Sequence, residues 1–331
     1  MGRKAGRRAD DSPFTRGEHQ GMNTTPVRAP AHWHRPLTIF AVVMAVTAVV
    51  ALGGIFLDSR ILTGVPIWLK PFKFAVSLGI YAITIAWMLT LLPRRSRIAE
   101  WAATVIVAMV TIEMVIIVGQ VLRGTTSHYN ETSALNAALW QAMGTSIMVA
   151  FVAHFVIAVI VARQPLADRA ASYAVRLGLG LTLLGMLAAV PMVLPSAAPG
   201  IEGVAGAHTV GLPDGGPGLP LVGWSTVGGD LRIGHFVGLH ALQALPLLAI
   251  LLNRFFAARL TVATRARLLL VAGAAYAGLT VSLTWQALRA QPLLAPDTLT
   301  LTVWAALAIA TAAAATLAVA RDRRPELALA A

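Results

Sequence analysis

Residues 100–122 read EWAATVIVAMVTIEMVIIVGQVL, an apolar stretch in which Glu113 is the one acidic residue deep inside. An α-helix rises about 1.5 Å per residue, so about 20 apolar residues cross the ~30 Å hydrocarbon core of a bilayer. Seven more stretches of similar length and composition occur in the chain. We therefore predict an all-α, polytopic membrane protein, a bundle of eight transmembrane helices. The other predicted spans are 37–57, 72–92, 136–162, 175–194, 231–252, 267–288 and 299–320.

The positive charge of the chain is unevenly placed between these spans. The formal net charge is +12, and 20 of the 26 Lys and Arg residues fall on one side of the predicted membrane. Lys and Arg stay on the side to which they need not be translocated, so the richer side is predicted to be cytoplasmic. Both termini then lie in the cytoplasm, at the inner membrane of a bacterium, and no nucleic-acid partner is expected. The six outer cations are Arg60, Lys70, Lys73, Arg123, Arg232 and Arg289.

Composition excludes several classes of protein. Hydrophobic residues make up 57% of the chain, which excludes an ordinary soluble domain. The chain has no cysteine, which excludes disulfides, thiolate metal sites and cysteine nucleophiles. The first span is longer than a signal-peptide core, so we expect it to be retained. Residues 1–35 are predicted to form a disordered basic arm in the cytoplasm, and residues 325–331 a C-terminal tail.

Short motifs recur in the two halves of the chain. Residues 69–74 read LKPFKF and residues 231–236 read LRIGHF, and both give Leu, a cation, two spacers, a basic residue and Phe. Residues 120–123 (QVLR) and 286–289 (QALR) match in the same order. We predict a parallel 4+4 internal repeat, in which binding sites are expected between the halves. The predicted copies are residues 36–163 and 164–324.

Five outer cations and one histidine occupy repeat-matched positions near the outer boundary. A charge held near hydrocarbon is unfavourable by roughly 2–3 kcal/mol at depth, so its repeated placement indicates a use. Gathered around one opening, these residues would attract a carboxylate, a phosphate or a lipid head group. The alternatives are snorkelling to the interface and local pairing with Asp58, Glu131, Asp230 or Asp297. The matched residues are Lys70, Lys73, Arg123, Arg232, His235 and Arg289.

Polar residues inside the spans suggest a path into the bundle. Glu113 lies near mid-bilayer, with Gln120 two turns along the same face. An ionised carboxylate there is unfavourable unless it is paired, so Glu113 either exchanges a proton, binds a cation or forms a structural hydrogen bond. His240 and Gln243 share a face of the sixth span. The residues predicted to line the path are Glu113, Gln120, His240, Gln243 and Gln286.

Two functions fit these residues best. The first is binding or transport of a small anionic solute or lipid through an outward-facing polar pocket, with the bilayer as partner and no cofactor. The second is a membrane-embedded hydrolase in which zinc generates hydroxide. Against zinc, His235 and His240 are five residues apart, about 140° around a helix. The candidate residues for zinc hydrolysis are His128, Asp230, His235 and His240, with Ser77 nearby.

Two lesser alternatives are a haem or quinone protein and a non-catalytic membrane subunit. The four-plus-four layout is similar to that of haem A synthase, whose haem-ligating histidines lie in both halves. This chain departs from that pattern, because its second and eighth spans have no histidine and its first half offers only His154 within a span.

The loop at 195–230 and its flanks carry the remaining signals. The loop is rich in Gly and Pro without helical or strand period, and at this length it is expected to be a lid over the opening. Residues 206–243 and 68–77 resemble uncharacterised polytopic bacterial membrane proteins. The resemblance implies a topology and no activity.

Overall fold

The computed structural model describes residues 33–166, 168–194 and 202–322. They contain eight helices long and apolar enough to cross a membrane, which confirms the predicted helical spans. The predicted arm up to residue 32, the first residues of the predicted lid and the C-terminal tail lie outside the described residues. The helices are α1 (Arg35–Leu57), α2 (Leu69–Thr90), α3 (Arg97–Leu122), α4 (Ala134–Arg163), α5 (Arg169–Leu187), α6 (Leu231–Phe256), α7 (Val262–Leu288) and α8 (Thr298–Ala320).

Helix α2 begins three residues earlier than the hydropathy pattern predicts. It starts at Leu69, so Lys70 lies within the helix instead of before it. The apolar count misses this turn because it contains Lys70, while Pro71 is tolerated in a first turn that lacks intrahelical acceptors. Most other helices start at a side chain that accepts a backbone N–H bond, as expected of N-caps. These N-caps include Ser96, Ser133, Asp168, Asp230, Thr261 and Asp297.

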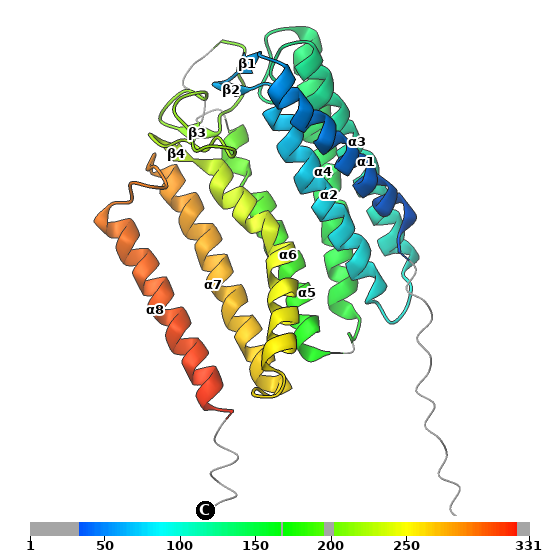
Figure 1. Cartoon of the computed structure of the whole chain (residues 1–331), viewed down its shortest axis with the longest axis vertical. Helices are drawn as coiled ribbons and strands as arrows, with labels where there is room; N and C mark the ends of the chain where they lie inside the picture. Colours follow the sequence, from blue (N-terminus) through cyan, green and yellow to red (C-terminus); the bar gives the residue numbers. More distant parts are fainter. Residues whose placement is uncertain (1–32, 167, 195–201, 323–331) are drawn as a thin grey trace, which may run out of the picture. The chain divides into compact units, whose positions relative to one another are not determined.

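Two short strand pairs lie at one end of the helices (Figure 1). Strands β1 (Ile61–Leu62) and β2 (Val65–Pro66) form a hairpin between α1 and α2. Strands β3 (Thr209–Val210) and β4 (Gly229–Asp230) pair antiparallel inside the loop between α5 and α6, for which the sequence predicted no strand. We call this end of the bundle the strand end. A 3₁₀ turn, η1 (Val190–Val193), also leads into that loop.

The helices pack mainly with their neighbours in the chain. In the first half α1 packs on α2 and α3 on α4, and in the second half α5 packs on α6 and α7, and α7 on α8. The halves meet where α4 packs on α5 and α2 on α6. Helices α5 and α6 approach closely, since a Cβ on Gly185 would lie 2.4 Å from the carbonyl carbon of Gly238. Figure 1 places α8 at one edge and α1 and α3 at the other.

The outer helices need a lipid environment. The most apolar window of α8 is only 6% buried and that of α1 17% buried, although both are strongly hydrophobic. Faces this large and apolar are not left to water in a monomeric soluble protein. In hydrocarbon they are matched to their surroundings, and each helix satisfies its own backbone hydrogen bonds. The chain is therefore an integral, multi-pass membrane protein.

Candidate functional site: a polar cavity at the strand end

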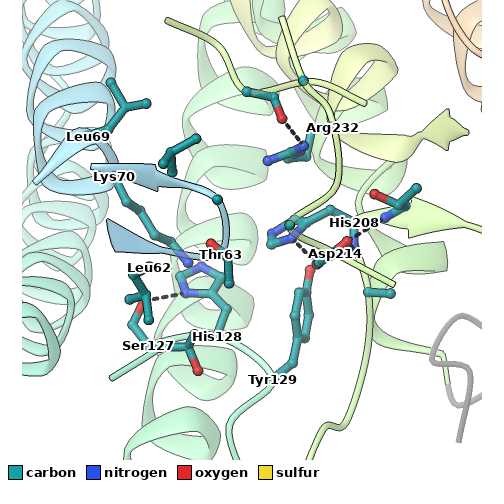
Figure 2. Close-up of a pocket in the computed structure, with 18 of the residues that line it drawn as sticks. Leu62, Thr63, Leu69, Lys70, Ser127, His128, Tyr129, His208, Asp214 and Arg232 are labelled. Carbon is teal, nitrogen blue, oxygen red and sulfur yellow. Dashed lines mark hydrogen bonds and ion pairs between the residues drawn. The ribbon is translucent and has the colours of Figure 1, made fainter. Parts of the chain in front are cut away.

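A cavity of about 540 Å³ opens at the strand end, a volume that suits a small molecule or head group. Its wall comes from both halves: α2, the β1–β2 hairpin and the α3–α4 loop on one side, the α5–α6 loop and α6 on the other. Figure 2 shows several of these side chains around the pocket. The charged and titratable residues in the wall include Lys70, Lys73, His128, His208, Asp214, Arg232 and His235.

The two lysines come from one face of the first turn of α2. Being three residues apart, they are neighbours on the helix surface. Lys73 Nζ donates to the carbonyl oxygen of Val222 at 2.8 Å, which ties α2 to the α5–α6 loop. Lys70 Nζ lies 5.9 Å from the ring centroid of Phe74, and makes no hydrogen bond or ion pair with any residue that the structure describes. Its ammonium group is thus available to a ligand in the cavity.

Arg232, in contrast, has a carboxylate of its own. Its guanidinium binds Asp230 through Nε to Oδ1 at 2.9 Å and Nη2 to Oδ2 at 2.5 Å. Nη2 also donates to the carbonyl oxygen of Gly223 at 2.5 Å. Asp230 is fully buried, accepts the amide of Ser225 and caps α6. The pair is close to neutral and holds the α5–α6 loop against the helix.

A His–Asp pair faces the lysines across the cavity. Asp214 accepts the backbone amides of His208 at 3.1 Å and Thr209 at 2.9 Å, and its Oδ2 lies 2.5 Å from His208 Nδ1. Burial alone would raise the pKa of Asp214, but the hydrogen bonds that it accepts from His208 and Thr209 lower it overall. The ionised carboxylate selects the Nδ1–H form of the ring and leaves Nε2 as an acceptor. The Tyr129 ring packs edge-on against it, with centroids 5.0 Å apart.

His128 lies at the floor of the cavity and connects it to Glu113. His128 Nε2 is 3.4 Å from Glu113 Oε1, and Nδ1 is 3.1 Å from Ser127 Oγ. Its ring contacts the rings of Phe74 and Trp140. Burial lowers the pKa of His128 well below its ordinary value, and the charge of nearby Lys70 lowers it further. His128 is therefore neutral near pH 7.

The structure does not bring every predicted outer cation to this cavity. Arg123 Nη1 donates to Gln120 Oε1 at 2.5 Å and to Asn136 Oδ1 at 2.9 Å. Arg289 pairs with Asp297 at 2.5 Å and lies over the Trp285 ring. Neither arginine is part of the cavity wall. The predicted ring of cations therefore separates into Lys70, Lys73 and Arg232 at the cavity and two arginines satisfied by local partners.

The predicted polar path is also divided. Gln120 Nε2 donates to Asn136 Oδ1 at 3.1 Å and to the carbonyl oxygen of Thr126 at 3.3 Å, and Gln286 Nε2 donates to the carbonyl oxygen of Pro292 at 2.8 Å, so both amides hold loop backbone in place. His240 Nδ1 contacts Gln243 Oε1 at 3.2 Å, as their shared face predicts. Gln243 in turn donates to Thr84 of α2 at 3.3 Å, across the contact between the halves. Neither His240 nor Gln243 lines the cavity.

The predicted zinc ligands are not assembled. Among the described residues, no three His, Cys, Asp or Glu side chains are grouped so as to hold a metal ion. Asp230 is occupied by Arg232, His235 Nδ1 lies 2.8 Å from the carbonyl oxygen of Gly185, and His240 contacts Gln243. Ser77 is absent from the cavity wall. His154 bonds Tyr81 and the Leu179 carbonyl and so is engaged within the bundle.

Three residues of the cavity wall were not predicted as site residues from the sequence: Tyr129, His208 and Asp214. All three lie in loops without periodicity, so no helix face or strand pattern pointed to them. A local signal does exist, because Asp214-Gly215 is a typical turn pair and a histidine stands six residues before it. The turn uses left-handed backbone at Gly211 (φ +83°) and Gly215 (φ +99°), which brings Asp214 back to the amide of His208.

Comparisons with protein-family models, with curated proteins and with solved structures give no match. Fold and site together define a multi-pass helical membrane protein with a polar cavity at one end.

Proposed function

We propose that this protein binds, and transports, a small anionic solute or the anionic head group of a lipid in the cavity at the strand end. The observation that carries the proposal is the Lys70 ammonium group, which lines the cavity without a hydrogen-bonding partner among the described residues. A cation at a membrane interface is normally paired, snorkelled or used. Lys70 is only partly exposed, beside a second lysine one turn away.

The charge balance of the cavity favours an anion. Arg232 is matched by Asp230 at 2.5 Å, and the Asp214 carboxylate, which accepts hydrogen bonds from His208 and Thr209, offsets the charge of one lysine. Lys73 donates to a neutral carbonyl group, and Lys70 has no described partner. The two lysines therefore leave positive charge in a partly enclosed space, where the electrostatic field is stronger than in bulk water. Charge-assisted bonds to a carboxylate or phosphate would satisfy it.

The placement of basic residues supports an outward-facing cavity. The strand end carries few cations, and the opposite end of the helices carries most of the described arginines, including Arg94, Arg95 and Arg97. By the positive-inside rule the strand end is outside, and the termini are in the cytoplasm of a bacterial cell. A solute or a lipid of the outer leaflet would then reach the cavity without crossing the bilayer.

The packing pattern supports the two-copy hypothesis on which transport depends. Four helix pairs recur in each half: α1–α2, α2–α3, α3–α4 and α1–α3, against α5–α6, α6–α7, α7–α8 and α5–α7. The equivalent helices α2 and α6 pack on each other. One contact between the halves has no counterpart under this repeat. Helix α4 packs on α5, but the corresponding helices α8 and α1 lie at opposite edges of the bundle (Figure 1). Rocking of the halves about the α2–α6 contact would change access to the cavity.

Binding measurements on the purified protein test this proposal. Isothermal titration with sulfate, phosphate and succinate probes free anions, and titration with short-chain phosphatidylglycerol against phosphatidylcholine probes a head group. Lys70→Gln should weaken binding of the preferred anion at least tenfold, because it removes the unpaired charge. Arg289→Gln is the matched control and should change affinity less than twofold, since Arg289 pairs with Asp297 outside the cavity. Equal affinity for Lys70→Gln and the unmodified protein contradicts the proposal.

One observation favours the hydrolase as a second candidate. The Asp214–His208 pair resembles the acid–base half of a hydrolytic site, with a carboxylate orienting a neutral imidazole in the cavity wall. In that case a cavity water gives its proton to His208 Nε2 and attacks the ester, and the leaving group later takes the proton. An ester hydrolysed by the unmodified protein and not by His208→Gln, with sulfate affinity unchanged, would establish this function.

A further inference from the structure

Glu113 is a buried carboxyl with one oxygen unsatisfied. Glu113 is 2% exposed, and its Oε2 atom has no hydrogen-bonding partner among the described residues. Glu113 lies on α3 outside the cavity wall. It contacts His128, which is part of the wall. Unsatisfied buried oxygens are rare in folded proteins, and an ionised carboxylate in this position is unfavourable. Both features favour the protonated form of the carboxyl group, because a proton is a ligand that fits without further space.

Two groups face Glu113 and decide its electrostatics. Lys70 of α2 is the charged residue close enough to interact with it, and His128 of the α3–α4 loop is 3.4 Å away. His128 in turn faces Lys70, His208 of the α5–α6 loop and His235 of α6. The charge state of Glu113 therefore acts first on Lys70, which is the residue proposed to bind the anion.

This coupling has a definite sign. When Glu113 is ionised, its charge offsets that of Lys70 and weakens the attraction for an anion in the cavity. When Glu113 carries a proton, less negative charge offsets that of Lys70, and the anion binds more tightly. By linkage, an anion that binds better to the protonated form must also promote uptake of the proton.

We propose that Glu113 is a proton-binding site connected to the cavity through His128, so that an anion and a proton are taken up together. The inference rests on the proposed function, since it needs an anion in the cavity. The transfer uses the neutral imidazole: a proton from bulk solvent, relayed by a cavity water that is left unchanged, adds at Nδ1 of His128, and the Nε2 proton passes to Glu113 Oε1. The ring returns to its first tautomer before the next transfer.

Sulfate is the probe for this proposal, because it does not itself titrate between about pH 5 and 9. Calorimetry in two buffers of different ionisation enthalpy gives the protons taken up per sulfate bound. For the unmodified protein we expect uptake approaching one proton, and an affinity that falls about tenfold per pH unit once Glu113 ionises. Glu113→Gln should still bind sulfate, with no proton uptake and no such pH dependence.

Three further variants keep the test decisive. Glu113→Asp retains a carboxyl and should retain proton uptake, which covers the case in which Glu113→Gln fails to fold. Glu100→Gln removes a carboxyl near the other end of the same helix, where Glu100 pairs with Arg95, and should leave uptake unchanged. His128→Gln should bind sulfate but take up the proton more slowly, as followed by stopped-flow with a pH-sensitive dye.

The outcomes separate the two proposals. Sulfate binding with the same proton uptake in Glu113→Gln as in the unmodified protein overturns the proton site and leaves the anion site standing. If sulfate does not bind, the titration is repeated with short-chain phosphatidylglycerol, whose phosphodiester also stays ionised in this range. Failure of both probes at the unmodified protein overturns the proposed function itself.

Discussion

Lys70 and Arg289 are both cations at the strand end of the bundle, yet their surroundings differ. Arg289 lies just after the last residue of α7 and finds Asp297 eight residues further along the chain, at 2.5 Å. Lys70 lies at the start of α2, and one turn on stands Phe74, an aromatic residue that offers its ring face and no acceptor oxygen. A cation near the interface thus serves structure where an acid is close in sequence and remains available where none is.

The largest expected effect concerns Arg232, a cavity cation that has its own acid. Arg232→Met would leave the fully buried Asp230 without its counter-ion. Removing one partner of a buried ion pair typically destabilises a protein by about 3–5 kcal/mol. Unfolding in mixed micelles should therefore show a loss of this size. The double variant Asp230→Asn with Arg232→Met should recover much of it, and a single variant as stable as the unmodified protein would mean that the pair is not desolvated.

A second variant would add a second acid to the cavity wall, which already holds Asp214. Thr63 lies in the cavity wall with left-handed backbone (φ +48°), a conformation that Asp and Asn tolerate. One negative charge in the cavity opposes a bound anion by about 2 kcal/mol at an effective dielectric constant of about 20, or roughly 30-fold in affinity. Thr63→Asp should show this loss by calorimetry. Thr63→Asn has nearly the same shape and should bind as the unmodified protein does; equal losses in both would indicate a steric effect.

The third prediction concerns pH and His128. Burial, with a further contribution from Lys70, lowers the pKa of His128 in the folded protein, whereas the unfolded chain titrates near 6.5. Below about pH 6.5 the unfolded state binds the proton first, so stability falls as the pH falls, by about 1.4 kcal/mol per pH unit for one group. His128→Gln should flatten the slope by that amount in micelle unfolding measurements between about pH 6.5 and 5. An unchanged slope would mean that His128 is protonated in the folded protein.

Hydropathy and charge were enough to predict the helices. About 20 apolar residues have one favourable solution in a bilayer, so the ends of α1, α3 and α8 fall within three residues of the predicted ones. The prediction was less accurate where charge enters a helix, as at Lys70. The predicted end of the fifth span at residue 194 agrees with a span over Arg169–Val193, in which α5 ends at Leu187 and the chain continues as a 3₁₀ turn around Pro191.

The candidate site was predicted only in part, for a physical reason. Lys70, Lys73, Arg232 and His235 lie on helices whose ends share a depth, so a repeat is enough to suggest that they converge. The positions of Arg123 and Arg289 depend on side-chain partners at separations of three to thirteen residues, which helix periodicity does not encode. The His208–Asp214 pair depends on glycine-rich backbone turns, so its geometry emerges only with the folded loop.

The smallest effect on stability and on anion affinity is expected at Arg289. Arg289→Met removes an ion pair whose side chains are 32% and 42% exposed, so water can solvate Asp297 once its partner is gone. Exposed pairs of this kind contribute little to stability. The unfolding midpoint in micelles should match that of the unmodified protein, in contrast to Arg232→Met, and sulfate affinity should change less than twofold. A loss of anion binding in Arg289→Met comparable to that in Lys70→Gln would show that an arginine outside the cavity wall also acts on the ligand. The distinction between cations with a local acid and cations available to a ligand would then fail.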